Sequence, residues 1–276
     1  MKTFKSAITL VRNSRGCYIL DTVKGCSIVN TQPNGCYDDC YAKSIADRYR
    51  LNFGKTVARH FDDDAPTSQV PLFDFKDNEH LTRIIREIRS IPMPFVRIGE
   101  MGDPSWDWRH TLSVCEKIKP AGKPIVIITK HWAPIPDDLL PALDGICVNT
   151  SVSALDDVDD MDARLKQYHR LKPYCRSVLR IVSCAFDETT DEGRARAAVQ
   201  EWLFDNENTL DTVFRPSKTN SFLARGVIKV TDRPFLRKAR VLASVYNPAT
   251  YLGHCSTCPD MCGVNERESN AQEPAA

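Results

Sequence analysis

Short runs of β-branched and apolar residues alternate with helical patterns along most of this 276-residue sequence. The run within Pro124–Thr129 reads Ile-Val-Ile-Ile at its centre, which is typical of a strand buried on both faces of a parallel sheet. Because helical segments separate such runs, the alternation predicts right-handed βαβ units in one α/β sheet. Five further strands are expected at Cys17–Val23, Phe95–Gly99, Gly145–Val152, Ser177–Cys184 and Thr212–Phe214.

One helix is predicted over Asn78–Ser90, where four apolar residues fall on a single helix face. Six strands with helices between them fit an open sheet or a partial barrel. Further helices are expected at Tyr41–Arg50, Leu112–Lys119, Asp159–Leu171 and Asp191–Phe204.

Composition and charge narrow the class of protein. With 42% hydrophobic and 26% charged residues, the chain has an ordinary globular composition. Its formal net charge of +1 does not make the whole molecule a strong attractant for nucleic acid. The apolar part of Met1–Asn13 is too short for a signal peptide, and no stretch is long enough to span a bilayer. We therefore expect a cytoplasmic protein with no membrane partner.

The chain has eleven cysteines, which is many for a reducing compartment. Clustered cysteines there more often bind metal or carry out chemistry than form disulfides. Cys147 and Cys184 lie inside apolar runs, so core packing explains them. Six others form two groups, and Cys17 lies upstream of the first. The first group is Cys26, Cys36 and Cys40, and the second is Cys255, Cys258 and Cys262.

The first group lies on a loop that joins the first predicted strand to a helix. Glycines and a proline in this loop permit the turns that bring Cys26 near Cys36 and Cys40. Three thiolates can hold three irons of a [4Fe–4S] cubane and leave the fourth iron open to a small molecule. A closed zinc site needs a fourth protein ligand, and Cys17 keeps that alternative open. Unconnected buried thiols are disfavoured, because the three cysteines share one glycine-containing loop.

The second group has gaps of two and three residues, which places Cys255, Cys258 and Cys262 on a tight loop suited to metal binding. His254 or Cys17 is the candidate fourth ligand. The spacing fits a second iron–sulfur cluster or a zinc site, with a redox disulfide as the alternative. The basic stretch 215–240 precedes this loop, and it suits either the phosphates of a nucleic acid or a solvated helix face.

The first cysteine segment resembles the motif of a divergent radical S-adenosylmethionine family whose members are frequent in phages and bacteria. The gaps between its cysteines hold nine and three residues, and both are longer than in the usual superfamily motif. The resemblance covers roughly residues 17–218, most of the chain. It rests on Gly25-Cys26, Gly35-Cys36 and Cys40-Tyr41-Ala42, and on the later segments Arg97–Ser105, Ile128–Lys130 and Asn149–Ser153.

The resemblance implies a [4Fe–4S] cluster on Cys26, Cys36 and Cys40, with S-adenosylmethionine bound at the open iron. It implies that a one-electron donor such as flavodoxin or ferredoxin reduces the cluster, and that a 5′-deoxyadenosyl radical then abstracts hydrogen from a substrate. We expect that substrate to be a nucleotide or a nucleic-acid base. We predict a partial (β/α)6 barrel-like parallel sheet with helices outside over residues 1–220. A basic, cysteine-rich extension is expected at 221–264 and a disordered tail at 265–276.

Polar residues just past the predicted strands are candidates for cofactor binding, because ligands gather at the carboxyl ends of strands in α/β sheets. Glu100, Gly102 and Asp103 follow the second strand. The resemblance implies that this segment accepts the ammonium group of S-adenosylmethionine, with Gly102 letting backbone approach the ligand. A polar turn without a ligand is the alternative.

Three more residues complete the predicted cofactor site. Ser151 and Ser153 end the fourth strand, where their hydroxyls suit the ribose or carboxylate of the cofactor or, alternatively, the start of a helix. Arg180 lies inside an apolar strand and requires a buried anion. That anion is either the cofactor carboxylate or an acid of this chain.

A non-catalytic module is the competing hypothesis, in which zinc or an iron–sulfur cluster shapes a surface that binds nucleic acid. The two hypotheses differ in colour. An anaerobically purified radical enzyme is expected to be brown, whereas a colourless, zinc-replete protein would favour the module.

Overall fold

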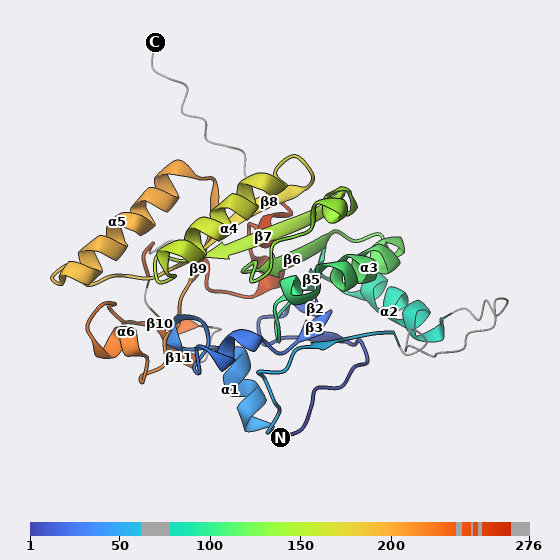
Figure 1. Ribbon diagram of the computed structural model, residues 1–276, viewed down its shortest axis with the longest axis horizontal. Helices are drawn as coiled ribbons and strands as arrows, with labels where there is room; N and C mark the ends of the chain where they lie inside the picture. Colours follow the sequence, from blue (N-terminus) through green and yellow to red (C-terminus); the bar gives the residue numbers. More distant parts are fainter. Residues whose placement is uncertain (62–77, 236–238, 244, 248–249, 266–276) are drawn as a thin grey trace, which may run out of the picture.

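The computed structural model describes residues 1–61, 78–235, 239–243, 245–247 and 250–265. Its main sheet has the strand order β1-β2-β5-β6-β7-β8-β9 (Figure 1). Strand β1 is antiparallel to β2, and every later neighbour is parallel. The strands are β1 (Leu10–Arg12), β2 (Tyr18–Leu20), β5 (Val96–Ile98), β6 (Ile125–Thr129), β7 (Ile146–Val152), β8 (Arg176–Ser183) and β9 (Thr209–Val213).

The predicted α/β class and the mostly parallel sheet are confirmed. The six parallel strands follow one another across the sheet in chain order, with β1 and β9 at the two edges, so the sheet is not closed. The barrel-like curvature therefore stays a prediction, as does the separate cysteine-rich extension. The sixth strand begins three residues earlier than expected, at Thr209 rather than Thr212.

The main helices lie where the apolar periodicity placed them, and their ends are set by capping side chains. The side chain of Asn78 accepts a hydrogen bond from the amide of Leu81 at 2.6 Å, and Thr190 caps a later helix through the amide of Gly193. Such caps satisfy amides that have no partner within the helix. The helices are α1 (Tyr41–Arg48), α2 (Glu79–Ser90), α3 (Trp108–Ile118), α4 (Val158–Leu171), α5 (Asp191–Asn206) and the short α6 (Ser221–Ala224).

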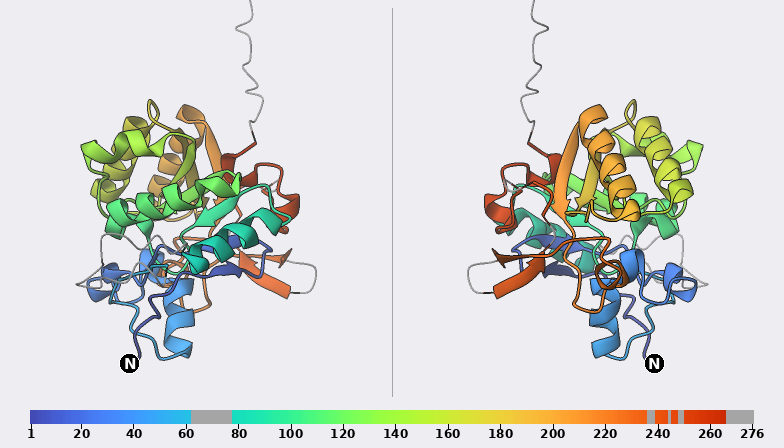
Figure 2. Two further views of the ribbon diagram at one scale, coloured as in Figure 1. Left: turned by 90° about the vertical axis from the view of Figure 1, so that its right-hand side faces the viewer. Right: turned by 90° about the vertical axis from the view of Figure 1, so that its left-hand side faces the viewer.

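The two faces of the sheet are covered by different parts of the chain. On one face, strand residues such as Ile98 and Ile127 pack with Ile84 of α2 and Leu112 of α3 in the largest apolar core. On the other face, a second cluster joins strand residues to Cys255 and neighbouring side chains of the C-terminal segment. Figure 2 shows that segment, in red, on the side of the sheet away from α4 and α5. The C-terminal cysteines are therefore built into the sheet's second core.

The first expected strand divides in two. Strand β2 ends at Leu20, and the short β3 (Val23–Lys24) pairs with β4 (Val57–Ala58) instead of continuing the main sheet. Asp21 lies at the break, where its carboxylate accepts hydrogen bonds from the amides of Glu100 and Met101 at 2.7 and 3.1 Å. This contact joins the strand that precedes the first cysteine loop to the segment that follows β5.

The hairpin of β10 (Thr231–Phe235) and β11 (Ala239–Ala243) was not predicted. It overlaps the end of the basic stretch 215–240, which was expected to be a helix face if solvated. The predicted tail at 265–276 lies outside the described residues from position 266 onward.

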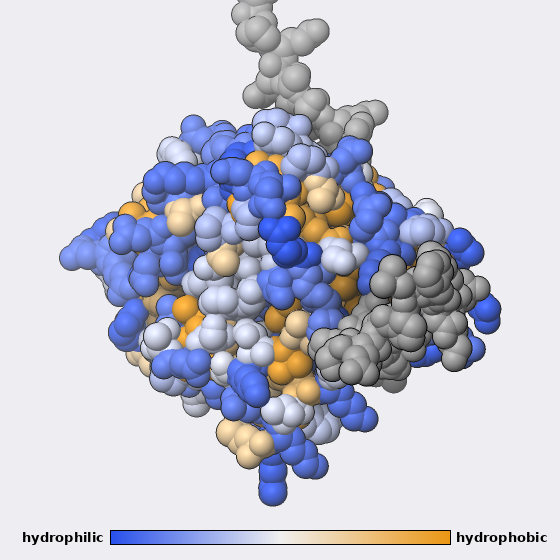
Figure 3. Space-filling model, turned by 45° about the vertical axis from the view of Figure 1, so that its right-hand side comes forward, coloured by the Kyte–Doolittle hydropathy of each residue, from blue (hydrophilic) through white to orange (hydrophobic). Residues whose placement is uncertain are grey.

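The surface is mostly hydrophilic over the face drawn in Figure 3, with apolar side chains in scattered patches. Within the part of the chain that the structure describes, no helix combines the length and apolar character needed to cross a membrane.

Candidate functional site

The first cysteine loop follows β3 and is anchored by backbone contacts. The amide of Gly25 donates to Met101 O at 2.8 Å, and that of Cys26 donates to Phe53 O at 2.7 Å. Gly25 also forms a parallel bridge with Gly102. A Cβ atom on Gly102 would lie 2.6 Å from Val23 O and 2.8 Å from Gly25 O. Gly102 is thus required for the close approach of two backbones, whereas the sequence suggested approach to a ligand.

Each thiol of this loop has a nitrogen donor or a cation beside it. The indole Nε1 of Trp106 donates to Cys26 Sγ at 3.4 Å. Cys40 precedes α1, and the backbone amides of Ala42 and Lys43 lie beside its sulfur, where they lower its pKa against the effect of burial. Cys36 lies within the electrostatic reach of a lysine that follows β6. Hydrogen bonds and positive charge at sulfur favour the thiolate, which is the form that binds metal.

The loop backbone is strained next to Cys36. Tyr37 and Asp38 both have φ of 57°, a left-handed conformation that non-glycine residues rarely adopt. A Cβ on Gly35 would lie 2.4 Å from Cys40 Cβ, so only glycine lets the chain turn tightly enough to bring Cys36 and Cys40 together. Strain of this kind persists only where the surrounding structure holds it in place.

Burial controls the ionisation of these thiols. Desolvation raises the pKa of Cys26 to about 11 and that of Cys36 to about 12, and the neighbouring Cys40 adds to both. The three sulfurs are therefore close enough to influence one another, yet they are protonated at neutral pH in the metal-free chain. Among the described residues, no three His, Cys, Asp or Glu side chains converge into a preformed metal site.

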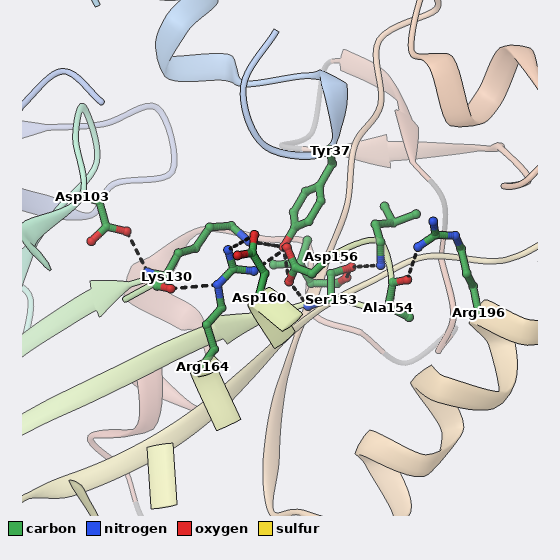
Figure 4. Close-up of polar contacts among 11 residues, drawn as sticks. Tyr37, Asp103, Lys130, Ser153, Ala154, Asp156, Asp160, Arg164 and Arg196 are labelled. Atoms are coloured by element: carbon green, nitrogen blue, oxygen red, sulfur yellow. Dashed lines mark hydrogen bonds and ion pairs between the residues drawn. The ribbon is translucent and has the colours of Figure 1, made fainter. Parts of the chain in front are cut away.

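A buried ionic network fixes this loop to the ends of β6 and β7 (Figure 4). Asp156 lies at its centre, with Arg164 Nη1 at 2.5 Å and Lys130 Nζ at 3.2 Å from Oδ1. The hydroxyl of Tyr37 donates to the other carboxylate oxygen at 3.2 Å, and Lys130 Nζ also contacts that hydroxyl. Tyr37 follows Cys36 directly, so the network positions the cysteine loop.

The network is held together by charge in a water-poor environment. Burial raises the pKa of Asp156, but the charges of Lys130 and Arg164 outweigh it and hold the pKa below its usual value. The side chains of Arg164 and Asp156 are only 2% and 5% exposed. The guanidinium also donates through Nε to Lys130 O at 2.8 Å. These groups depend on one another, because each would be costly to bury alone.

This network was not predicted from the sequence, although one residue pattern indicated it. Arg164 occupies the apolar face of the helix predicted at Asp159–Leu171, in step with Met161, Leu165 and Tyr168. A charge at such a position requires a buried partner. Asp156 supplies it, and the arginine is packed over the ring of Trp132 at 4.6 Å.

The predicted ammonium-binding residues have different surroundings. The carboxylate of Asp103 accepts from Thr129 Oγ1 at 2.7 Å, from the amide of Lys130 at 2.7 Å and from the amide of Ser105 at 2.9 Å. Glu100 is half-buried and accepts from Asn13 Nδ2 at 2.9 Å through Oε1. Asp103 is thus engaged by its own chain on both oxygens, and Glu100 on one.

The cofactor-binding residues predicted on the later strands, Ser151, Ser153 and Arg180, also differ in their contacts. Ser153 Oγ donates to Val182 O at 2.6 Å and accepts from the amide of Leu155 at 3.2 Å. Ser151 and Arg180 are partners in the β7–β8 register. Arg180 Nη1 lies 3.9 Å from Cys262 Sγ, so the structure brings this arginine to the second cysteine group.

A cavity of about 330 Å³ opens beside the first loop. Cys36 and Tyr37 form part of its wall, together with Trp132 and the α6 residue Phe222. Its carboxylates come from Asp38, Asp156, Asp157 and Asp160. The cavity reaches the cysteine loop from outside and combines aromatic surface with negative charge.

The second cysteine loop lies against the opposite face of the sheet. The amide of Cys255 donates to Arg15 O at 2.7 Å, and its side chain lies in the same buried apolar cluster as that of Cys17. The interaction with Cys17 and the charges of nearby arginines together lower the pKa of Cys255 to about 6, although burial opposes them. His254, the other candidate fourth ligand, is exposed.

Comparison with protein-family models, with curated proteins and with solved structures gives no match to this chain. The function of the chain is therefore inferred from the geometry of the two cysteine loops and of the strand ends.

Proposed function

We propose that this chain is a radical S-adenosylmethionine enzyme in which Cys26, Cys36 and Cys40 hold a [4Fe–4S] cluster. The supporting observation is the placement of three cysteines on one anchored loop beside the carboxyl ends of parallel strands. Ligands gather at that edge of α/β sheets. A barrel-like curvature of the sheet and a distinct cysteine-rich extension belong to the same proposal.

The donor set fits a cubane with one open iron. Three thiolates occupy three irons, and the site has no fourth cysteine in the same loop. When bound and reduced by a one-electron donor such as flavodoxin or ferredoxin, the cluster with S-adenosylmethionine supplies a 5′-deoxyadenosyl radical. Trp106 and the first amides of α1 stabilise the thiolates of Cys26 and Cys40. The Asp156 network holds Cys36 in place through Tyr37.

The cofactor contacts divide according to what each side chain already binds. Glu100 remains the better candidate for the ammonium group, because Asp103 uses both carboxylate oxygens within the chain. Ser151 is the better candidate hydroxyl, because Ser153 bonds to the backbone of β8. Gly102 supports the loop rather than the ligand. The proposed substrate is a nucleotide or a nucleic-acid base.

The test is reductive cleavage of S-adenosylmethionine. The anaerobically reconstituted chain, reduced with dithionite, is expected to form 5′-deoxyadenosine, quantified by liquid chromatography and mass spectrometry. The Cys36→Ala variant is expected to lose this product to background, whereas Cys115→Ala, a buried cysteine in the largest apolar core, keeps it. A colourless protein that binds zinc and forms no 5′-deoxyadenosine would instead support the non-catalytic module.

A further inference from the structure

The fold brings together two cysteines from opposite ends of the chain. Cys17 lies directly before β2, and Cys255 lies in the C-terminal segment, yet their thiols lie close enough to shift each other's pKa. Both are buried in the same apolar cluster, on the face of the sheet opposite α2 and α3. The amide of Cys255 is fixed to Arg15 O at 2.7 Å, so backbone and side-chain contacts both hold this pair.

The other two cysteines of the C-terminal loop, Cys258 and Cys262, lie on a turn whose backbone suits metal binding. The backbone amides of Asp260 and Met261 lie beside the sulfur of Cys258 and lower its pKa against the effect of burial. Met261 and Cys262 have φ of 45° and 55°, a conformation that costs energy in non-glycine residues. Asn149 Nδ2 donates to Cys262 O at 2.9 Å, which fastens the strained turn to β7. Amides beside a sulfur stabilise it as a thiolate ligand.

Positive charge surrounds this loop. A cavity of about 50 Å³ at the loop is lined by four arginines and two aspartates together with Cys255, Cys258 and Cys262. The arginines come from four separate places in the chain, and one of them, Arg180, lies 3.9 Å from Cys262 Sγ. A metal centre with four thiolates carries a net charge of about −2, which matches the excess of arginines over aspartates. The arginines are Arg15, Arg97, Arg180 and Arg215.

We infer that Cys17, Cys255, Cys258 and Cys262 are the four ligands of one closed metal centre, either zinc or a second [4Fe–4S] cluster. The four free thiols do not converge in the metal-free chain, so loading turns their side chains toward a common point. Four protein ligands leave no open position for a cofactor. The centre therefore links the C-terminal segment to the chain just before β2. This inference does not depend on the proposed radical chemistry.

The test uses a full chain in which the first loop cannot hold metal, carrying Cys26→Ser, Cys36→Ser and Cys40→Ser. It is purified anaerobically and loaded in separate arms with zinc, or with ferrous iron and sulfide. Metal and acid-labile sulfide are then counted. The expected result is about one zinc, or about four iron and four sulfide, per chain. Adding Cys17→Ser is expected to lower bound metal at least tenfold, whereas Cys147→Ser and His254→Ala leave the count unchanged.

A second measurement avoids reliance on the folding of the Cys17→Ser variant. Cobalt(II) is bound to the same triple variant, and absorption spectra report the number of thiolate ligands, expected to be four. Alkylation and peptide mapping should show Cys17 protected with cobalt and released by a chelator. Full metal content without Cys17, a spectrum of three thiolates, or a metal-free protein with a Cys17–Cys255 disulfide would each overturn the inference.

Discussion

The two cysteine loops share a backbone design but lie in opposite electrostatic surroundings. Both contain a pair of left-handed residues, Tyr37 and Asp38 in one and Met261 and Cys262 in the other. The first loop lies among carboxylates at the strand ends, and burial keeps its thiols protonated. The second lies among arginines on the face of the sheet. The first loop therefore needs a bound cation to ionise, whereas the second is prepared for negative charge.

Thiol ionisation should show the largest difference between the two loops. In the metal-free protein, the alkylation rate of Cys255 is expected to rise with pH through a midpoint near 6, because only the thiolate reacts. Cys26 should reach its midpoint only near pH 11. Iodoacetamide labelling from pH 5 to 9, read by peptide mass spectrometry, should reach a plateau for Cys255 and should still be rising for Cys26 at pH 9. Because the midpoint rather than the maximal rate is compared, different accessibility does not affect the result. Coincident midpoints would remove the proposed contrast.

Removing Arg164, the buried cation of the network that positions the first loop, should destabilise the protein strongly. Arg164→Met leaves Asp156 buried without its closest partner at 2.5 Å, and breaking such a pair costs about 3–5 kcal/mol. Urea denaturation measures the loss. The matched control is Lys166→Met, which breaks an exposed pair with Asp162 and should leave the stability almost unchanged. Equal effects of the two changes would show that the network does not support the loop.

A smaller effect is expected where two backbones meet behind Cys26. Gly102→Ala would place a methyl group 2.6 Å from Val23 O, and overpacking of this kind costs about 1–3 kcal/mol. Labelling of Cys26 should become faster, while that of Cys262 on the other face stays constant and serves as an internal control. A stable variant with unchanged labelling at Cys26 would contradict the role given to Gly102.

The smallest effect is expected from one hydroxyl. Tyr37→Phe removes the hydrogen bond to Asp156 at 3.2 Å, which is worth about 1 kcal/mol. Tyr174→Phe, at an exposed position, is the control and should be neutral. Thermal unfolding of the two variants gives the comparison, and a Tyr37→Phe protein as stable as the parent would show that the loop is positioned by other contacts.

The sequence predicted the parallel strands well because their apolar runs are buried on both faces, as at Ile125–Thr129. Strand β1 was missed because Leu10–Arg12 is a short edge strand with partly exposed residues. Strand-end residues were also located, but the sequence could not show which were already bonded within the chain. Asp103 and Ser153 proved to be engaged by neighbouring backbone, as the turn and helix-start alternatives implied.

The partner of Arg180 was beyond what a linear pattern reveals. Its need for an anion was evident from the apolar strand around it, but its neighbour is Cys262, 82 residues away in the chain. Cys17 was a candidate partner for either cysteine group, and the fold places it in the apolar cluster of Cys255. Local patterns identify which residues require partners, and only the packed sheet decides which distant partner each one finds.

The central claim, a cluster with an open iron on the first loop, is tested most directly by electron paramagnetic resonance. The protein should carry Cys255→Ser, Cys258→Ser and Cys262→Ser, so that only the first loop can hold a cluster. After anaerobic reconstitution and reduction, spectra are recorded without and with S-adenosylmethionine. We predict a [4Fe–4S] signal whose g values shift when S-adenosylmethionine is added. Absence of the signal, or a signal unchanged by S-adenosylmethionine, would contradict the account.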